Sequence, residues 1–368
     1  MRILFCSDAL TIDGINSYIL NTGTALIHAG HDVAVLGRWA GVKGFQARYR
    51  QEGFTVITCP SISVGNAYFD FRAKRFHPDV IMTDHRRTFP LATRLKHITH
   101  APVITYFLDP LWKTDKKGRD IPSLEKFSDA FIAFEPGILA SLHELTSGVP
   151  IVKMPRPVDV FFSPSELPSR KDFTILCFGR LSRYKTPGIF RMLENITRIQ
   201  EHIPDFRINI LGGGGWRLWK FRLLAHKINR SLGRKCVKIT GTQDDPADFI
   251  RNANVVCASA TSAMEAAYSL RPVIAMCTGY LGQVTMQNLD EAERSYFSER
   301  YVLEDNRGDF SGLIDDLFRI YDSYCDAEFV RDLRNVSRKL GEEFSAGETV
   351  RIFAEIMSGI QRHPKNSV

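Results

Sequence analysis

The sequence predicts an α/β protein with two doubly wound, mostly parallel sheets, each covered by helices. Three observations predict this class. Apolar, strand-like runs alternate with helical patterns almost from end to end. A polar segment with two prolines and three serines, residues 162–171, interrupts the alternation and reads as a linker. The length of 368 residues suits two domains of ordinary size.

The first half reads as strands separated by helical stretches. An apolar run at Met1–Ser7 suits a buried parallel strand, and apolar residues at helical spacing follow over Ile15–Gly30. Further strand-like runs begin at His31, Phe54, Asp79, Pro102, Asp129 and Val149. Because strands alternate with helices, we expect parallel pairing, with ligands bound at the carboxyl ends of the strands.

The second half restarts the alternation at Phe173. Strand-like runs then begin at Arg207, Val237, Asn254 and Pro272. Three helical stretches are expected to close the chain without further strands. The domains expected from this pattern are residues 1–162, residues 172–345 and a last helix over 346–368. The expected packing face of the last helix is Val350, Phe353, Ala354, Ile356 and Met357.

Composition excludes several classes of protein. Hydrophobic residues make up 44% and charged residues 24% of the chain, as in globular proteins. No apolar run approaches the ~20 residues of a membrane-spanning helix. The seven cysteines are widely spaced without a Cys-x-x-Cys pair, so we expect reduced, buried thiols in a cytoplasmic protein and no metal site. The net charge of +7 favours anionic partners.

Four segments at strand ends are candidates for binding a ligand. Gly14 precedes the first long helix, and Arg180 and Lys185 follow the first strand of the second half. A run of four glycines that includes Gly213 follows the next strand. Glu265 lies near the start of a later helix, where a carboxylate can accept hydrogen bonds from a ribose diol. Each segment can also be an ordinary turn, a solvated loop or a helix start.

Taken in order, these segments resemble the GT-B-fold retaining glycosyltransferases of family 4, the glycosyl transferases group 1. The resemblance rests on the segments GRLSRYK, ILGGGG, ITG and SAMEAAYSLRPVIA in the second half. In the first half it rests on the Gly14 loop, GHDV and PDVI, and between the halves on MPRPVDVFFSP. It implies two Rossmann-like domains that face each other across a cleft, with the C-terminal helix crossing back to the first domain.

The resemblance also implies an activity. A sugar would move from a nucleotide diphosphate sugar to a polysaccharide, glycolipid or similar acceptor, with retention of configuration and without a metal or other cofactor. Arg180 and Lys185 would contact the donor diphosphate and stabilise its charge as the bond to the sugar breaks. Glu265 would bind the donor ribose. The other donor-binding positions implied are Gly14, Gly213, Gly241, Ala263 and Met264.

Two positions depart from the family pattern. Where the family usually has a second glutamate, eight positions before Glu265, this chain has Cys257, and the loop is shorter. Where many members carry a histidine, this chain has Leu108, followed by Asp109. Asp109 and His85 are therefore candidate catalytic residues, and each also suits a turn or a structural role. A sugar-nucleotide-binding protein with little or no transferase activity and a GT-B sugar-nucleotide epimerase stay open as alternatives.

Two basic regions favour an anionic partner. Residues 216–235 hold seven Lys or Arg and no acidic residue, and their pattern predicts a helix with one packed face. Its outer face suits an anionic membrane, although we favour a simply solvated face. The second region suits a lipid-linked or phosphorylated acceptor or the inner face of a membrane, and nucleic acid is disfavoured. This region comprises Arg72, Lys74, Arg75, Arg86, Arg87, Lys113, Lys116, Lys117 and Arg119.

Overall fold

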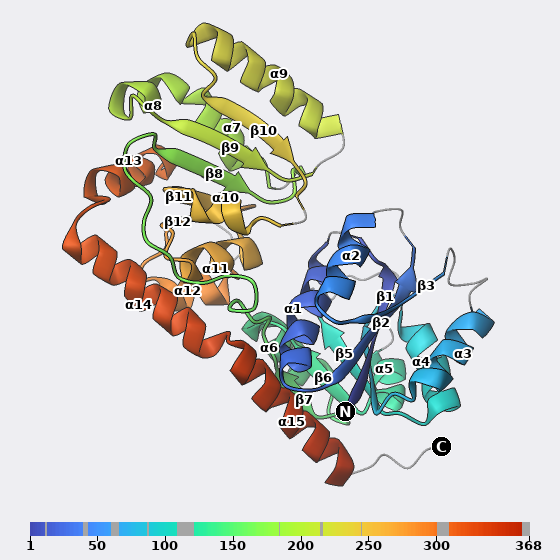
Figure 1. The fold of residues 1–368 in the computed structure, drawn as a ribbon. Coiled ribbons are helices and arrows are strands. Elements are labelled where there is room, and N and C mark those ends of the chain that lie inside the picture. Colours follow the sequence, from blue (N-terminus) through green and yellow to red (C-terminus); the bar gives the residue numbers. More distant parts are fainter. Residues whose placement is uncertain are drawn as a thin grey trace. The chain divides into compact units, whose positions relative to one another are not determined.

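The computed structural model divides into two compact units (Figure 1). Unit 1 comprises Met1–Val160 and Phe344–Val368, and unit 2 comprises Phe161–Glu343. Each unit contains its own sheet with helices packed against it. The structure describes residues 1–11, 13–39, 43–59, 66–86, 88–108, 121–183, 185–213, 216–243, 245–299 and 309–362.

Unit 1 is built on a parallel sheet whose described strands run in the order β3-β2-β1-β4-β5-β6-β7. These strands are β1 (Arg2–Ala9), β2 (Asp32–Arg38), β3 (Thr55–Cys59), β4 (Val80–Asp84), β5 (Val103–Phe107), β6 (Ala130–Ala133) and β7 (Ile151–Lys153). Successive side chains of β1, Ile3 and Leu4, are both fully buried. Because they point to opposite faces, both faces of the sheet are covered, as predicted from the apolar runs.

Helices cover this sheet. They are α1 (Gly14–His28), α2 (Lys43–Gln51), α3 (Asn66–Phe76), α4 (Phe89–Thr99), α5 (Ile121–Phe127), α6 (Pro136–Leu145) and α15 (Ala346–Arg362). The last of these, α15, comes from the far end of the chain and packs against α1 (Figure 1). The backbone N–H of Val158 donates to the carbonyl oxygen of Phe344 at 2.8 Å, which ties the start of this segment to unit 1.

The buried face of α15 differs slightly from the prediction. Phe353, Ile356 and Met357 are buried as expected, but Val350 is only half-buried and Ala354 is exposed. Thr349 and Ile352 are buried instead. The buried positions follow helical spacing around Phe353, whose ring lies 6.0 Å from that of His31, and Ala354 falls outside this stripe.

Unit 2 contains a second sheet with the described order β10-β9-β8-β11-β12-β13. Its strands are β8 (Thr174–Phe178), β9 (Arg207–Leu211), β10 (Val237–Gly241), β11 (Val255–Ala258), β12 (Val273–Met276) and β13 (Tyr280–Gln283). The sequence did not predict β13, which pairs antiparallel with β12 at the edge of the sheet. It has four residues and contains Gly282, so its apolar pattern is too short to stand out.

Four helices, not the three predicted, follow β13 among the described residues. The first three belong to unit 2, and the fourth is α15. The helices of unit 2 are α7 (Pro187–Glu194), α8 (Ile196–His202), α9 (Trp216–Ser231), α10 (Ala247–Arg251), α11 (Ala260–Tyr268), α12 (Leu289–Arg294), α13 (Leu313–Ser323) and α14 (Ala327–Glu343). The α/β class with two sheets is confirmed.

The polar segment between the predicted domains lies on unit 2. The guanidinium of Arg271, which is fully buried, donates to the carbonyl oxygen of Glu166 at 2.7 Å. The side-chain amide of Asn254 donates to the carbonyl oxygen of Ser169 at 3.0 Å. A segment whose composition predicts a linker is therefore held in place by buried polar side chains of the domain that follows it.

Candidate functional site

The candidate site of unit 2 lies where the strand order reverses. From β8, the chain first runs outward through β9 and β10, and then returns to the other side of β8 to form β11. In open α/β sheets, ligands bind at this switch point, outside the carboxyl ends of the strands. The loop after β8 begins at Gly179 and carries the predicted residues Arg180 and Lys185. After β11, Ser259 leads directly into α11, which carries the predicted residues Ala263, Met264 and Glu265.

Backbone hydrogen bonds join the loops after β8, β9 and β10. The N–H of Leu181 donates to the carbonyl oxygen of Gly213 at 2.8 Å, and the N–H of Gly212 donates to that of Gly241 at 2.9 Å. Gly212 has a φ of +148°, and a Cβ there would lie 1.8 Å from the carbonyl oxygen of Gly179. Glycine is required at this crossing, and the structure thus brings the predicted residues Gly213 and Gly241 to the edge that carries Arg180.

Lys185 and Ser259 converge on a carboxylate that the sequence analysis missed. The Lys185 ammonium lies 2.6 Å from Glu299 Oε2, and the Ser259 hydroxyl donates to the same oxygen at 2.7 Å. The thiol of Cys277, just after β12, donates to it at 3.3 Å. Burial alone would raise the pKa of Glu299, but Lys185 and the two donors outweigh it and hold that pKa below its usual value.

The turn that carries Glu299 also frames the start of α11. Tyr296, Phe297 and Ser298 all have positive φ angles, which are sparse for residues with a side chain. The carbonyl oxygen of Tyr296 accepts the N–H of Ala260 at 3.2 Å. The side-chain hydroxyl of Tyr296 lies 2.6 Å from the hydroxyl of Thr261. This turn thus fixes the N-terminus of α11, whose dipole favours a negative charge.

The other predicted residues of unit 2 differ in exposure. Arg180 is exposed and forms no ion pair with the described residues. Ala263, Met264 and Glu265 lie within α11 and are buried, and Glu265 is only 3% exposed. A carboxyl group is seldom buried to this extent unless it is hydrogen-bonded.

Cys257 is part of the sheet rather than of a loop. It is the third residue of β11, lies opposite Cys177 of β8, and is buried. Its contact with Cys177, together with burial, raises its pKa well above the usual value. The position that corresponds to the family's second glutamate therefore faces the core. The structure instead brings the Glu299 carboxylate to this edge of the sheet, from a turn with no recognisable motif.

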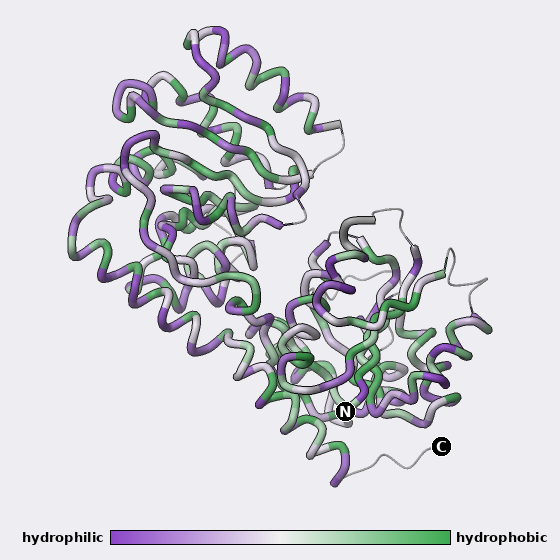
Figure 2. The backbone as a smooth tube through the Cα atoms, in the orientation of Figure 1, coloured by the Kyte–Doolittle hydropathy of each residue, from purple (hydrophilic) through white to green (hydrophobic). Residues whose placement is uncertain are grey.

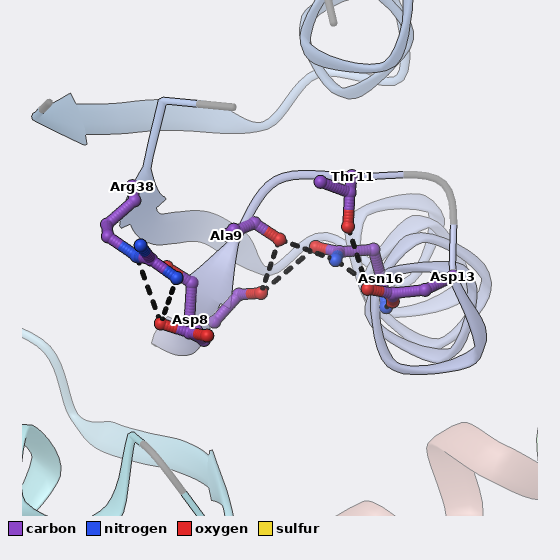
Figure 3. A network of polar contacts seen from close by, with 7 residues as sticks. Asp8, Ala9, Thr11, Asp13, Asn16 and Arg38 are labelled. Atoms are coloured by element: carbon purple, nitrogen blue, oxygen red, sulfur yellow. Dashed lines mark hydrogen bonds and ion pairs between the residues drawn. The ribbon is translucent and has the colours of Figure 1, made fainter. Parts of the chain in front are cut away.

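In unit 1, the turn between β1 and α1 is held by polar side chains (Figure 3). Asp13 caps α1 by accepting the N–H of Asn16 at 2.8 Å, and the Asn16 amide donates to the carbonyl oxygen of Ala9 at 2.8 Å. Nearby, Arg38 Nε lies 3.0 Å from Asp8 Oδ1. Gly14 is the first residue of α1, and a Cβ there would meet no atom within 4 Å. The predicted residue thus borders open space, beside a carboxylate that already occupies the helix N-terminus.

His85 follows β4 and is buried. Its ring stacks on that of Phe107, the last residue of β5, with ring centroids 4.6 Å apart. Next to it, Asp84 accepts the N–H of Arg86 at 2.6 Å, and burial raises the pKa of Asp84. This packing fits the structural alternative for His85. The following predicted residues lie outside the described part of the chain: Asp109, Arg87, Lys113, Lys116, Lys117 and Arg119.

The cysteines and helices add three general findings. All seven cysteines are free, and five of them are buried as expected, whereas Cys59 is half-buried and Cys325 is exposed. Among the described residues, no three His, Cys, Asp or Glu side chains gather as a metal site would require. No helix in the described ranges combines the length and apolar character needed to cross a bilayer.

Comparisons with known proteins bear on this fold and site. Residues 172–292, which span β8 to α12, match the family Glycosyl transferases group 1. HepE from Anabaena, solved with UDP and glucose, has 14% identity and a TM-score of 0.67, covering 98% of this chain and 100% of HepE. The fold is GT-B. The resemblance to Glycosyl transferases group 1 and to GT-B-fold glycosyltransferases is confirmed by these two matches.

Other solved structures agree. A glycosyltransferase from Rickettsia africae has 15% identity and a TM-score of 0.63, covering 100% of this chain and 99% of that protein. The pneumococcal O-GlcNAc transferase GtfA, solved with UDP and GlcNAc, has 10% identity and a TM-score of 0.67, covering 98% of this GT-B chain and 99% of GtfA. At these identities the likeness shows the fold alone. No curated protein matches the sequence.

Proposed function

We propose that this protein is a glycosyltransferase that uses a nucleotide diphosphate sugar as donor. One observation carries the proposal. The segment that matches Glycosyl transferases group 1, residues 172–292, has the cation Lys185 at its topological switch point, with the cation Arg180 in the same loop. A switch point is where such folds bind nucleotides, and a diphosphate needs cations.

The proposed chemistry follows from charge. Breaking the bond between the sugar and the diphosphate leaves negative charge on the departing oxygen. Arg180 offers a planar fork and Lys185 a point charge to stabilise it. The ion pair with Glu299 holds the flexible Lys185 side chain in place before the donor arrives. The side chain therefore needs little rearrangement when charge develops on the diphosphate.

Helix α11 would complete the donor site. Its N-terminus is framed by the Tyr296–Glu299 turn, and the Ser259 hydroxyl is directed to Glu299 instead of capping the helix. By the family resemblance, the backbone near Ala263 and Met264 would approach the donor phosphates. Glu265 would accept hydrogen bonds from the ribose hydroxyls. Gly14, Gly213 and Gly241 would border the donor in this scheme.

The donor base is proposed from the similar proteins. HepE has been solved with UDP-glucose and GtfA with UDP and GlcNAc, so we choose a UDP-sugar as the first donor to test. We further propose transfer with retention of configuration and without a metal. The acceptor would be a polysaccharide, glycolipid or similar saccharide. This protein would be cytoplasmic and would bind that acceptor at the inner face of a membrane.

The test is turnover of UDP-sugars. We expect slow release of UDP from one conjugate in the absence of acceptor, and a strong loss of that release in the Arg180→Ala and Lys185→Ala variants. Release that both variants retain at the wild-type rate would contradict the diphosphate assignment. Binding without any release, even with saccharide acceptors, would favour a sugar-nucleotide-binding protein. The anomeric configuration of a transfer product, read by NMR, tests retention.

A further inference from the structure

Helix α9 of unit 2 exposes two large apolar side chains. Trp219 is 65% and Leu223 is 53% exposed. They lie four residues apart, so they are neighbours on one stripe of the helix. Phe221, Ala225 and Ile228, on the opposite side, are buried in the core of the unit. The face predicted to pack on the sheet does so, and Trp219 and Leu223 therefore are not needed for that packing.

Cations continue and flank this exposed stripe. Lys227 and Arg230 follow Leu223 at helical spacing, and Arg222 lies beside it. All three are exposed, and α9 contains no acidic residue. Figure 2 shows hydrophilic residues interspersed with hydrophobic ones along this helix. The outer face thus combines an aromatic side chain and a leucine with several cations, rather than cations alone.

We propose that the outer face of α9 docks on the surface of an anionic phospholipid membrane. Lipid headgroups supply negative charge for Arg222, Lys227 and Arg230. The boundary between headgroups and acyl chains accepts Trp219 and Leu223, since tryptophan and leucine next to cations are typical of interfacial helices. Nucleic acid is a less suitable partner, because its phosphates would form no favourable contact with the exposed Leu223 side chain. The proposal does not rest on the transfer reaction.

The other basic surface of the described chain is less suited to this role. Helix α3 of unit 1 also exposes an aromatic residue, Phe71. There, however, the guanidinium of Arg72 lies 5.7 Å from the Tyr68 ring, and the helix carries the acidic residue Asp70, paired with Arg94 at 3.0 Å. Asp70 lowers the positive charge of this surface, and the Tyr68 ring is already in contact with a cation. Both features reduce the attraction of the surface for anionic lipids.

The test is sedimentation of the full chain with phosphatidylcholine vesicles, with and without phosphatidylglycerol. We expect binding only to the anionic vesicles, weakening as salt rises. The double variant Trp219→Gln/Leu223→Gln should bind at least about ten-fold more weakly. The triple variant Arg222→Gln/Lys227→Gln/Arg230→Gln should lose about five-fold per charge removed. Unchanged melting temperatures would show that both variants fold.

A matched control removes an exposed leucine elsewhere. Leu145, at the end of α6, is 46% exposed, and Leu145→Gln should bind anionic vesicles like the wild type. Wild-type binding by the double variant, or an equal loss in Leu145→Gln, would overturn the proposal. So would tight binding of a single-stranded RNA combined with no vesicle binding, which would assign the cations to nucleic acid.

Discussion

Lys185 Nζ and Glu299 Oε2 lie 2.6 Å apart and join two segments that are 114 residues apart in the sequence. The contact is partly buried, with the two side chains 27% and 18% exposed. It stands at the carboxyl edge of unit 2, where the loops after β8 and β11 begin. The cation that we propose for the donor diphosphate is thus already ordered by a carboxylate of the same unit.

Replacing either of the two cations proposed for the donor diphosphate should reduce turnover. Arg180→Ala and Lys185→Ala should each lower kcat by about 100- to 1,000-fold, since each removes fixed positive charge from the departing diphosphate. Arg183→Ala is the matched control, because Arg183 is an exposed cation of the same loop. It should keep nearly full activity. An equal loss in Arg183→Ala would mean that only the net charge of the loop matters.

The Glu299 carboxylate should make stability depend on pH. Its pKa in the folded protein lies below the usual value, so it stabilises the fold above about pH 4 and loses this effect as pH falls further. Urea unfolding should find Glu299→Gln less stable than wild type by about 1–3 kcal/mol at neutral pH, with a smaller difference in acid. Glu194→Gln, at an exposed site on α7, should differ little from wild type. A Glu299→Gln deficit that is constant with pH would contradict the ion pair.

The close approach of Gly212 to the carbonyl oxygen of Gly179 should make stability sensitive to a single added methyl group. In Gly212→Ala, the new Cβ would overlap the carbonyl oxygen of Gly179, so the loops after β8 and β9 must separate. We expect a loss of about 1–3 kcal/mol in unfolding free energy and weaker nucleotide binding. Gly359→Ala in α15, where a Cβ meets no atom within 4 Å, should leave stability unchanged or slightly raised. A wild-type melting curve for Gly212→Ala would show that the loops after β8 and β9 can separate without loss of stability.

Glu265 should contribute to nucleotide affinity through the ribose. Glu265→Gln keeps the side-chain shape and should weaken binding of a nucleoside diphosphate by about ten- to 100-fold, as expected for lost hydrogen bonds to a charged group. The 2′-deoxy nucleotide provides the control. If the carboxylate binds the ribose hydroxyls, the substitution should cost less affinity for the deoxy ligand. Equal losses with both ligands would remove the ribose role.

Much of the fold could be predicted because its strands are short apolar runs between helical patterns. The strand β13 was missed, since its four residues carry too little pattern, and Ala354 was placed on the wrong side of α15. The candidate residues Arg180, Lys185 and Gly213 could be proposed from the sequence because they lie in segments that follow strands. Glu299 could not, because its place at the site depends on contacts with distant segments and on a turn of left-handed residues.

The most direct test of the account is nucleotide binding by the intact protein. Melting curves should be recorded with UDP, GDP, ADP, TDP and CDP, and repeated with Arg180→Ala and Arg183→Ala. At one hundred times its dissociation constant, a bound nucleotide adds about 2.7 kcal/mol of stability. We predict a clear rise in melting temperature with UDP that Arg180→Ala loses and Arg183→Ala keeps. A flat response to all five nucleotides would contradict a donor site at the edge of unit 2.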